Sequence, residues 1–253
     1  MMLFKVNIIH KIVDATRMIT NVPATTPPKY HVSEGVNLIS INGLVDIKKP
    51  WKRYVVIGAG KTGIDAILYL LDNKVDSQRI VWIVSNDCWY LGRDGFEDVK
   101  GLSEQFFCIF NNILTAEDIN DVYKKGEAAG QFLRLDKNIW PTKMRAATMS
   151  SKELEKLQRI GNIVRLGRID RIEAESMIFK DGESIPTDFE SLHIDCSTSG
   201  SDFPPVKEKI FDGNQINLQL VQIPPSATSA AMIAALEIRY YDFPLRYKYS
   251  YII

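Results

Sequence analysis

Residues 54–63 of this chain read YVVIGAGKTG, and they carry the clearest structural signal in the sequence. The first four residues are aromatic or β-branched and show no polar alternation, which is typical of a parallel strand buried on both faces. Three glycines follow with the spacing Gly-x-Gly-x-x-Gly, and residues 64–71 then carry apolar side chains at helical spacing. A strand, a glycine turn and a helix in direct succession are the context that a dinucleotide-binding fingerprint requires.

Each of the three glycines has an expected task. Gly58 allows the tight turn out of the strand, Gly60 removes a Cβ that would block a pyrophosphate, and Gly63 lets the helix pack close to the strand. The free N–H groups at the start of the helix then face the phosphates. We therefore expect Gly58, Gly60, Lys61, Thr62 and Gly63 to hold the pyrophosphate of a dinucleotide. The alternative is a glycine turn of the same shape that binds no ligand.

The tripeptide Gly60-Lys61-Thr62 also resembles the end of a P-loop. That motif needs a glycine five positions earlier, where this chain has Val55. The residues between them would have to form a loop, yet their pattern is that of a strand. The sequence therefore argues against a P-loop nucleotidase.

Residues 79–84 form a second apolar, β-branched run, which completes a βαβ unit. An NAD site usually places an acidic residue at the end of this strand, to hold the ribose hydroxyls. Here Ser85 follows the strand directly, and Asp87 comes later, inside a loop. A hydroxyl at Ser85 and a cation at Arg93 suit a 2′-phosphate better, which favours NADP, with NAD as the alternative. An ordinary surface position for Arg93 also remains open.

Residues 96–160 have the composition of a helical insertion, with helices expected at 102–113, 116–129 and 151–160. Thr115 is the expected N-cap of the second helix, because acidic residues follow it. Ser150 and Glu153 have the spacing of a capping box at the start of the third helix.

Beyond this insertion the pattern changes to short strands, expected at 163–166, 168–174, 176–180 and 192–196. Asp181 and Gly182 indicate a hairpin turn between two of them. A last helix is expected at 226–237, followed by an aromatic-rich tail without a clear period. Near the start of the chain, a strand is expected to run into residues 13–16.

The overall composition is that of an ordinary globular protein, with 45% hydrophobic and 25% charged residues. Lys+Arg and Asp+Glu both number 31, so the chain lacks the basic field that binding to nucleic acid requires. No apolar run approaches the roughly 18 residues of a membrane helix, and the N-terminal residues lack a continuous signal-peptide core. We therefore expect a cytoplasmic protein with neither a nucleic-acid nor a membrane partner.

The cysteines and histidines argue against a disulfide scaffold, a dithiol redox centre and a zinc site. Neither residue type shows the close spacing that such sites use. They stand far apart in the chain, at Cys88, Cys108 and Cys196, and at His10, His31 and His193. We therefore expect no metal site.

Taken together, these motifs resemble the NAD(P)/FAD-binding flavoprotein oxidoreductases, specifically a flavin-dependent monooxygenase-like group. The resemblance covers residues 13–237, and its matching stretches are 55–65, 79–84 with 89–91 and Arg93, 164–168, and 192–200. The glycine motif is shared by many families. The stretch from Trp82 to Arg93 and the strand end at Asp195-Cys196 are more particular to this group.

The resemblance implies an α/β fold with two nested domains of the Rossmann type. Residues 51–186 would form a parallel-sheet NAD(P)-binding domain with the helical insertion at 96–160. Residues 1–50 would be a remnant of an FAD-type domain, and residues 187–253 its return segment followed by a divergent tail. No Gly-x-Gly-x-x-Gly precedes position 58, so the FAD-type domain is expected to lack its own phosphate-binding part.

The activity implied by this resemblance is hydride transfer from NADPH to flavin by an NAD(P)H-dependent flavoprotein oxidoreductase, with NADP (or NAD) and FAD as cofactors. The missing FAD fingerprint keeps a second interpretation open, a truncated or non-catalytic nucleotide-binding remnant without FAD. No catalytic side chain is assigned. The expected partner is a small-molecule nucleotide, and an exposed half-domain also favours self-association.

Overall fold

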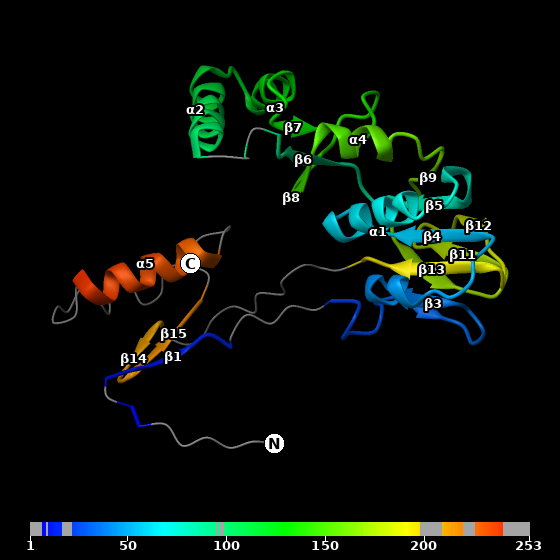
Figure 1. The fold of residues 1–253 in the computed structure, drawn as a ribbon, viewed down its shortest axis with the longest axis horizontal. Helices are drawn as coiled ribbons and strands as arrows, with labels where there is room; N and C mark the ends of the chain where they lie inside the picture. The colour runs from blue at the N-terminus through cyan, green and yellow to red at the C-terminus, as the bar shows by residue number, and fades with distance from the viewer. Residues whose placement is uncertain are drawn as a thin grey trace. The chain divides into compact units, whose positions relative to one another are not determined.

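The computed structural model describes residues 7–8, 10–16, 22–94, 96, 99–197, 209–219 and 226–239. The chain divides into two compact units. The larger unit comprises Val22–Thr198, and the smaller unit combines Met1–Asn21 with Ser199–Ile253. Figure 1 labels most of the strands and helices of both units.

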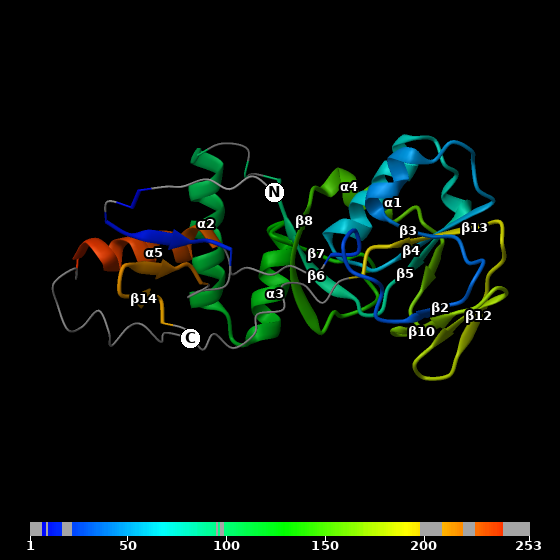
Figure 2. The same cartoon turned by 90° about the horizontal axis from the view of Figure 1, so that it is seen from below.

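The larger unit is built around a five-stranded sheet in which every neighbouring pair of strands is parallel. In spatial order its strands are β3 (Leu38–Ser40), β13 (Ser191–Asp195), β4 (Arg53–Ile57), β5 (Ile80–Ile83) and β9 (Asn162–Val164). The helix α1 (Lys61–Asp72) connects β4 to β5. This βαβ unit in a parallel sheet confirms the α/β prediction, and Figure 2 shows α1 beside the strands that it joins.

Both faces of this sheet are covered, which explains why β4 lacks polar alternation. The side chains of Tyr54 and Val56 belong to a buried cluster with Ile64 and other apolar residues of α1. The alternate side chains, Val55 and Ile57, belong to a second cluster, which includes residues of a neighbouring sheet. The larger unit therefore has three layers, with the parallel sheet in the middle.

The second sheet of the larger unit has the strand order β12-β11-β10-β2. Its strands are β2 (His31–Val32), β10 (Ile169–Ile172), β11 (Ser176–Phe179) and β12 (Ser184–Pro186). The predicted turn at residues 181–182 lies between β11 and β12, and Gly182 adopts a left-handed φ of 88°. The strands expected at 168–174 and 176–180 are therefore confirmed, with shorter bounds.

The helical insertion expected at 96–160 is only partly helical. It contains α2 (Val99–Thr115), α3 (Ile119–Ala128) and α4 (Ser151–Leu157), but also β7 (Phe132–Leu133) and β8 (Lys143–Met149). These two strands flank β6 (Cys88–Gly92) in a small mixed sheet. The prediction was wrong at β8 because pairing with a distant strand overrides the helix propensity of its Lys, Met and Ala residues.

The two predicted helix caps in this region have different outcomes. The side chain of Asp118, not that of Thr115, caps α3, because Asp118 accepts a hydrogen bond of 2.8 Å from the backbone N–H of Asp121. Thr115 is instead the last residue of α2. The capping box of Ser150 and Glu153 at the start of α4 is present as predicted.

The central sheet also extends beyond the predicted 51–186 boundaries. The strand β13 lies between β3 and β4, so residues on both sides of 51–186 complete the same sheet. Sequence order conceals this arrangement, because parallel neighbours in a sheet are commonly far apart along the chain. The compact unit accordingly runs from residue 22 to residue 198.

The smaller unit brings together two segments from opposite ends of the sequence. The strand β1 (Ile12–Asp14) pairs in parallel with β15 (Gln215–Asn217), which pairs antiparallel with β14 (Phe211–Asp212). The helix α5 (Ser226–Arg239) places Ile233 in a buried cluster with residues of this small sheet. The last three residues of the matching stretch 192–200 and the aromatic tail at 240–253 lie outside the described residues.

Two kinds of site are absent from the part of the chain that the structure describes. None of the helices there has the length and apolar character needed to cross a bilayer. The same residues include no group of three or more His, Cys, Asp or Glu side chains arranged to hold a metal ion.

His193 is buried in β13 and held at both ring nitrogens. Its Nδ1 lies 3.1 Å from the carbonyl oxygen of Asn37, and its Nε2 lies 2.9 Å from the hydroxyl of Thr187. A carbonyl only accepts, so Nδ1 donates and the neutral ring accepts the Thr187 hydrogen at Nε2. Burial lowers the pKa of His193 below its ordinary value of 6.5, with the field of Arg53 also acting in that direction.

We expect the larger unit to lose stability as the pH falls through the ordinary histidine pKa. The unfolded chain takes up a proton there that folded His193 excludes, so the free energy of unfolding declines by up to about 1.4 kcal/mol per pH unit. Above that pKa both states are neutral and this dependence vanishes. Urea titrations at about pH 7.5 and about pH 5.5 measure it. A His193→Gln variant should show a flatter dependence, and equal slopes in the two proteins would contradict the assignment.

Candidate nucleotide-binding site

The glycine turn begins where β4 ends, at the carboxyl edge of the parallel sheet. Gly58 has a φ of 118°, in the left-handed region that glycine tolerates. A Cβ at this position would lie 2.8 Å from the backbone oxygen of Cys196, so a larger residue also lacks space. The backbone N–H of Gly58 donates to the carbonyl of Ile83 at 3.0 Å, which ties the turn to β5. Both backbone angle and space therefore require glycine.

The third glycine lies inside α1, against the turn itself. A Cβ at Gly63 would overlap the backbone oxygen of Gly58. The helix consequently approaches the strand end more closely than any side chain allows. This is the close helix–strand packing expected of the third glycine in the motif.

Two buried aromatic residues hold the carbonyl groups of the turn. The indole Nε1 of Trp82 donates to the oxygen of Gly58 at 2.9 Å, and the hydroxyl of Tyr90 donates to the oxygen of Ala59 at 3.0 Å. Sequence reasoning missed this role for both residues. The sequence does contain a signal for it. Both residues lie in apolar stretches expected to be buried, and a buried indole N–H or phenol hydroxyl needs a hydrogen-bond partner.

The N-terminus of α1 has no cap from a side chain. Gly60 is its N-cap residue, and the first turn of the helix contains no acidic residue. By contrast, α3 and α4 begin with the side-chain caps of Asp118 and Ser150. The first N–H groups of a helix point outward and carry partial positive charge, so an uncapped N-terminus favours an anion. Gly60 itself has an ordinary φ of −84°, so its backbone angle does not demand glycine.

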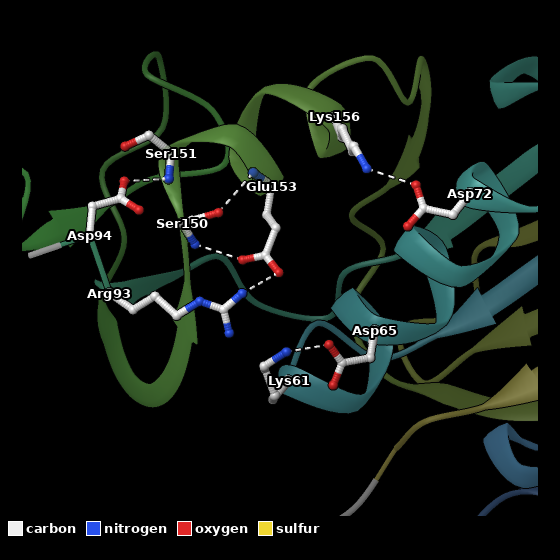
Figure 3. Close-up of polar contacts among 9 residues, drawn as sticks. All are labelled: Lys61, Asp65, Asp72, Arg93, Asp94, Ser150, Ser151, Glu153 and Lys156. Atoms are coloured by element: carbon white, nitrogen blue, oxygen red, sulfur yellow. Dashed lines mark hydrogen bonds and ion pairs between the residues drawn. The ribbon is translucent and has the colours of Figure 1, made fainter. Parts of the chain in front are cut away.

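Lys61 and Thr62 occupy the first turn of α1, as the motif predicts. The ammonium group of Lys61 forms an ion pair with Asp65, one turn further along the helix (Figure 3). Both side chains remain more than a third exposed, at 37% and 47%. The cation is therefore accessible, and its present partner lies on the solvent side of the helix.

Arg93 follows β6 and extends toward α4 (Figure 3). Its backbone N–H donates to the oxygen of Met149 at 3.0 Å, and its Nη2 donates to Glu153 Oε1 at 2.6 Å. Burial opposes ionisation of Glu153. A hydrogen bond from the backbone of Ser150 and the charges of Arg93 and Lys61 nevertheless lower its pKa. Glu153 thus lies within the electrostatic reach of both cations predicted for the site.

Ser85 lies two residues beyond the end of β5 and is half-buried. Ile57 pairs with Ile83 in the register of β4 and β5, so Ser85 and the glycine turn share one edge of the sheet. Among the described residues, no hydrogen bond joins Ser85 to Arg93, whose partners are Met149 and Glu153. Asp87 forms an ion pair with Arg165 at 2.9 Å, so its carboxylate is engaged elsewhere.

Cys196 and Asp195 also lie near the turn, at the end of β13, and both are buried. Burial, together with the charges of Asp195 and Asp65, raises the pKa of the Cys196 thiol to about 12. Burial also raises the pKa of Asp195, which accepts hydrogen bonds from the backbone and the hydroxyl of Ser197 at 2.9 and 2.5 Å. A thiol in this setting stays protonated at neutral pH and is a poor nucleophile.

The parallel sheet, the glycine turn and the uncapped helix together define an α/β fold of the Rossmann type. No protein-family model matches the chain. It is 37% identical over 243 residues to uncharacterized proteins of Mycobacterium bovis and Mycobacterium tuberculosis. These alignments cover 94% of this chain and 45% of each relative, so the chain spans less than half the length of these curated relatives.

Two solved structures are similar at 13% sequence identity. An open crystal structure of cyclohexanone monooxygenase aligns with a TM-score of 0.44, covering 76% of this chain and 49% of the other. A flavin-containing monooxygenase from Stenotrophomonas maltophilia aligns with a TM-score of 0.37, covering 83% of this chain and 49% of the other.

Proposed function

We propose that the chain binds a nicotinamide dinucleotide at the glycine turn, with NADP preferred over NAD, and serves an oxidoreductase of the flavoprotein type. The observation that carries this proposal is the uncapped N-terminus of α1 directly after the turn at Gly58. The turn carbonyls are already bound by Trp82 and Tyr90, and no side chain caps this helix start, so its first N–H groups are left for solvent or for a ligand. A pyrophosphate supplies acceptors of the right charge.

Two cations extend the site beyond the backbone. Lys61 lies in the first turn of α1, and Arg93 lies directly after β6. The positive charges of both residues lower the pKa of Glu153. In the proposed complex Lys61 and the first turn of α1 bind the pyrophosphate, while Ser85 and Arg93 bind the adenosine ribose and its 2′-phosphate. These residues bind and orient the dinucleotide, and no side chain of the chain is assigned a proton-transfer step.

The flavin part of the proposal rests on the sequence resemblance. The residues described in the smaller unit do not fit an FAD pyrophosphate, because they contain no glycine turn that leads into a helix. We therefore derive no flavin-dependent step from this chain. When bound, a flavin would accept the hydride of NADPH, and its site would have to draw on residues beyond those described here.

The proposal predicts that NADPH stabilises the protein against heat and urea. A ligand that binds only the folded state, present at about 100 times its Kd, raises the free energy of unfolding by about 2.7 kcal/mol. Calorimetric titration should give a lower Kd for NADPH than for NADH, and Arg93→Ala should weaken NADPH binding by about tenfold. The matched control is Arg171→Ala, which also removes an arginine paired with a glutamate, Glu173, but on the second sheet.

Two results would overturn parts of this proposal. If neither NADPH nor NADH at millimolar concentration changes the unfolding transition, the nucleotide site is wrong. If NADPH binds but the protein, after incubation with FAD, shows no flavin absorbance near about 450 nm, the flavin role is wrong for this chain. The second result would favour the alternative interpretation, a non-catalytic nucleotide-binding protein, because the bound dinucleotide would have no flavin to reduce.

A further inference from the structure

Glu153 joins the start of α4 to the cation at the proposed nucleotide site. Its carboxylate uses both oxygens for different tasks: Oε2 accepts from the backbone N–H of Ser150 at 2.7 Å, and Oε1 accepts from Arg93 Nη2 at 2.6 Å. The backbone N–H of Glu153 donates in return to the hydroxyl of Ser150 at 3.2 Å, completing the capping box. Figure 3 shows this carboxylate between the helix start and the guanidinium of Arg93.

The helix that carries Glu153 is itself anchored to the nucleotide-binding helix. Lys156 of α4 forms an ion pair with Asp72 of α1 at 2.7 Å, and Leu157 is completely buried in the same core cluster as α1. Side-chain exposure falls from 48% at Arg93 to 19% at Glu153. The carboxylate is therefore the fixed member of the pair and the guanidinium is the accessible one.

The ion pair leaves most of the guanidinium available. A guanidinium has five N–H donors, and Glu153 takes one at Nη2. In the ranges that the structure describes, no other hydrogen bond of the Arg93 side chain occurs. Four N–H donors remain, and the second N–H of Nη2 lies beside an N–H of Nη1 or Nε in the planar arrangement that binds a phosphate through two parallel hydrogen bonds.

We propose that Glu153 is a positioning residue that sets the preference for NADPH over NADH, by holding Arg93 ready for the 2′-phosphate. This inference rests on the proposed nucleotide site. A free arginine side chain loses much rotamer freedom when it binds a ligand, and a residue that holds it beforehand removes that loss from the binding step. Glu153 has no direct contact with the ligand in this proposal and acts only through Arg93.

The decisive variant is Glu153→Gln. Glutamine is accepted at this position of a capping box, so its amide oxygen keeps the bond from Ser150 and α4 stays capped. Its amide nitrogen then faces Nη2, donor against donor, and Arg93 is released. We expect the Kd for NADPH to rise by about tenfold, while the Kd for NADH changes by less than about twofold.

Asp94→Asn is the matched control. The Asp94 carboxylate accepts from the backbone N–H of Ser151 at 2.7 Å, at the same helix start, without an ion pair to Arg93. This variant removes one negative charge from the same neighbourhood. NADPH is the more anionic ligand because of its 2′-phosphate, so the loss of this charge should favour NADPH slightly, whereas the loss of positioning in Glu153→Gln should disfavour it.

A double-mutant cycle separates positioning from a general electrostatic effect. In the Arg93→Ala background, Glu153→Gln should leave the Kd for NADPH unchanged. The inference is overturned if Glu153→Gln tightens NADPH binding, weakens both nucleotides equally, or keeps its effect without Arg93. If the wild-type protein binds neither nucleotide, the proposed function fails and this inference fails with it. If the wild type prefers NADPH but the variant keeps that preference, this inference alone fails.

Discussion

A Gly63→Ala variant should lose dinucleotide binding and much of the stability of the larger unit. The added methyl group would overlap the backbone oxygen of Gly58, and neither partner is a flexible side chain that can swing aside. The helix α1 would have to move away from β4, opening the cluster that contains Ile64 and Ile67. Overpacking of this kind costs about 1–3 kcal/mol of folding free energy, and more where backbone has to shift.

Alanine variants of two other glycines serve as controls for this prediction. An added Cβ at Gly161 has only the amide nitrogen of Gln78 nearby, at 4.0 Å, so Gly161→Ala should be nearly neutral. Gly182 has open space but a φ of 88°, so Gly182→Ala measures the cost of the left-handed backbone alone, about 1 kcal/mol. Urea unfolding and NADPH titration of all three variants provide the comparison. A Gly63→Ala protein that is as stable as Gly161→Ala and still binds NADPH would disprove the close helix–strand contact.

Removing the donors that hold the turn should have the second-largest effect. Trp82→Phe leaves the oxygen of Gly58 without its indole partner, and Tyr90→Phe does the same to the oxygen of Ala59. A buried acceptor left without a donor costs about 1–3 kcal/mol. Each carbonyl would then be free to rotate toward solvent and turn the adjacent N–H group inward. We expect each variant to weaken NADPH binding by about tenfold and the double variant to weaken it further.

Trp89 supplies a matched control for the loss of an indole. It is 1% exposed, and its Nε1 has no hydrogen-bond partner among the residues that the structure describes. Trp89→Phe therefore removes a buried indole without breaking a hydrogen bond. Its Kd for NADPH should match that of the wild type, while both tryptophan variants lose some stability to reduced packing. Equal NADPH affinity in Trp82→Phe and Trp89→Phe would show that the turn does not depend on its anchored carbonyl.

The sequence predicts the turn and its flanking elements well, because their signals are local. The run at 54–57, the glycine spacing and the apolar face of 64–71 adjoin one another, and each constrains the next. The same applies to the capping box at Ser150, whose hydrogen bonds join residues three apart. By contrast, the residues of β8 carry no local signal of a strand. They form one because they pair with β6, which lies some fifty residues earlier in the chain.

The candidate site also combines features that local sequence predicts with features that depend on long-range contacts. The backbone and Lys61 at the helix start follow from the motif itself. The anchors of its carbonyls come from Trp82 and Tyr90, which are 24 and 31 residues away from their acceptors. Sequence reasoning identifies Glu153 as a capping residue and Arg93 as a candidate phosphate ligand, but it does not relate them. Their contact spans 60 residues, and it exists only because β6 and β8 pair and α4 follows β8 directly.

By itself, the sequence determined that this protein contains a buried strand, a glycine turn and a helix in direct succession, since those features depend on neighbours along the chain. Only the tertiary structure decided that β13 and β3 complete the sheet beside β4, that two aromatic side chains hold the turn, and that a glutamate holds the arginine. These contacts join residues that are far apart in sequence. They depend on strand pairing and on the burial of polar tips, which no local pattern encodes.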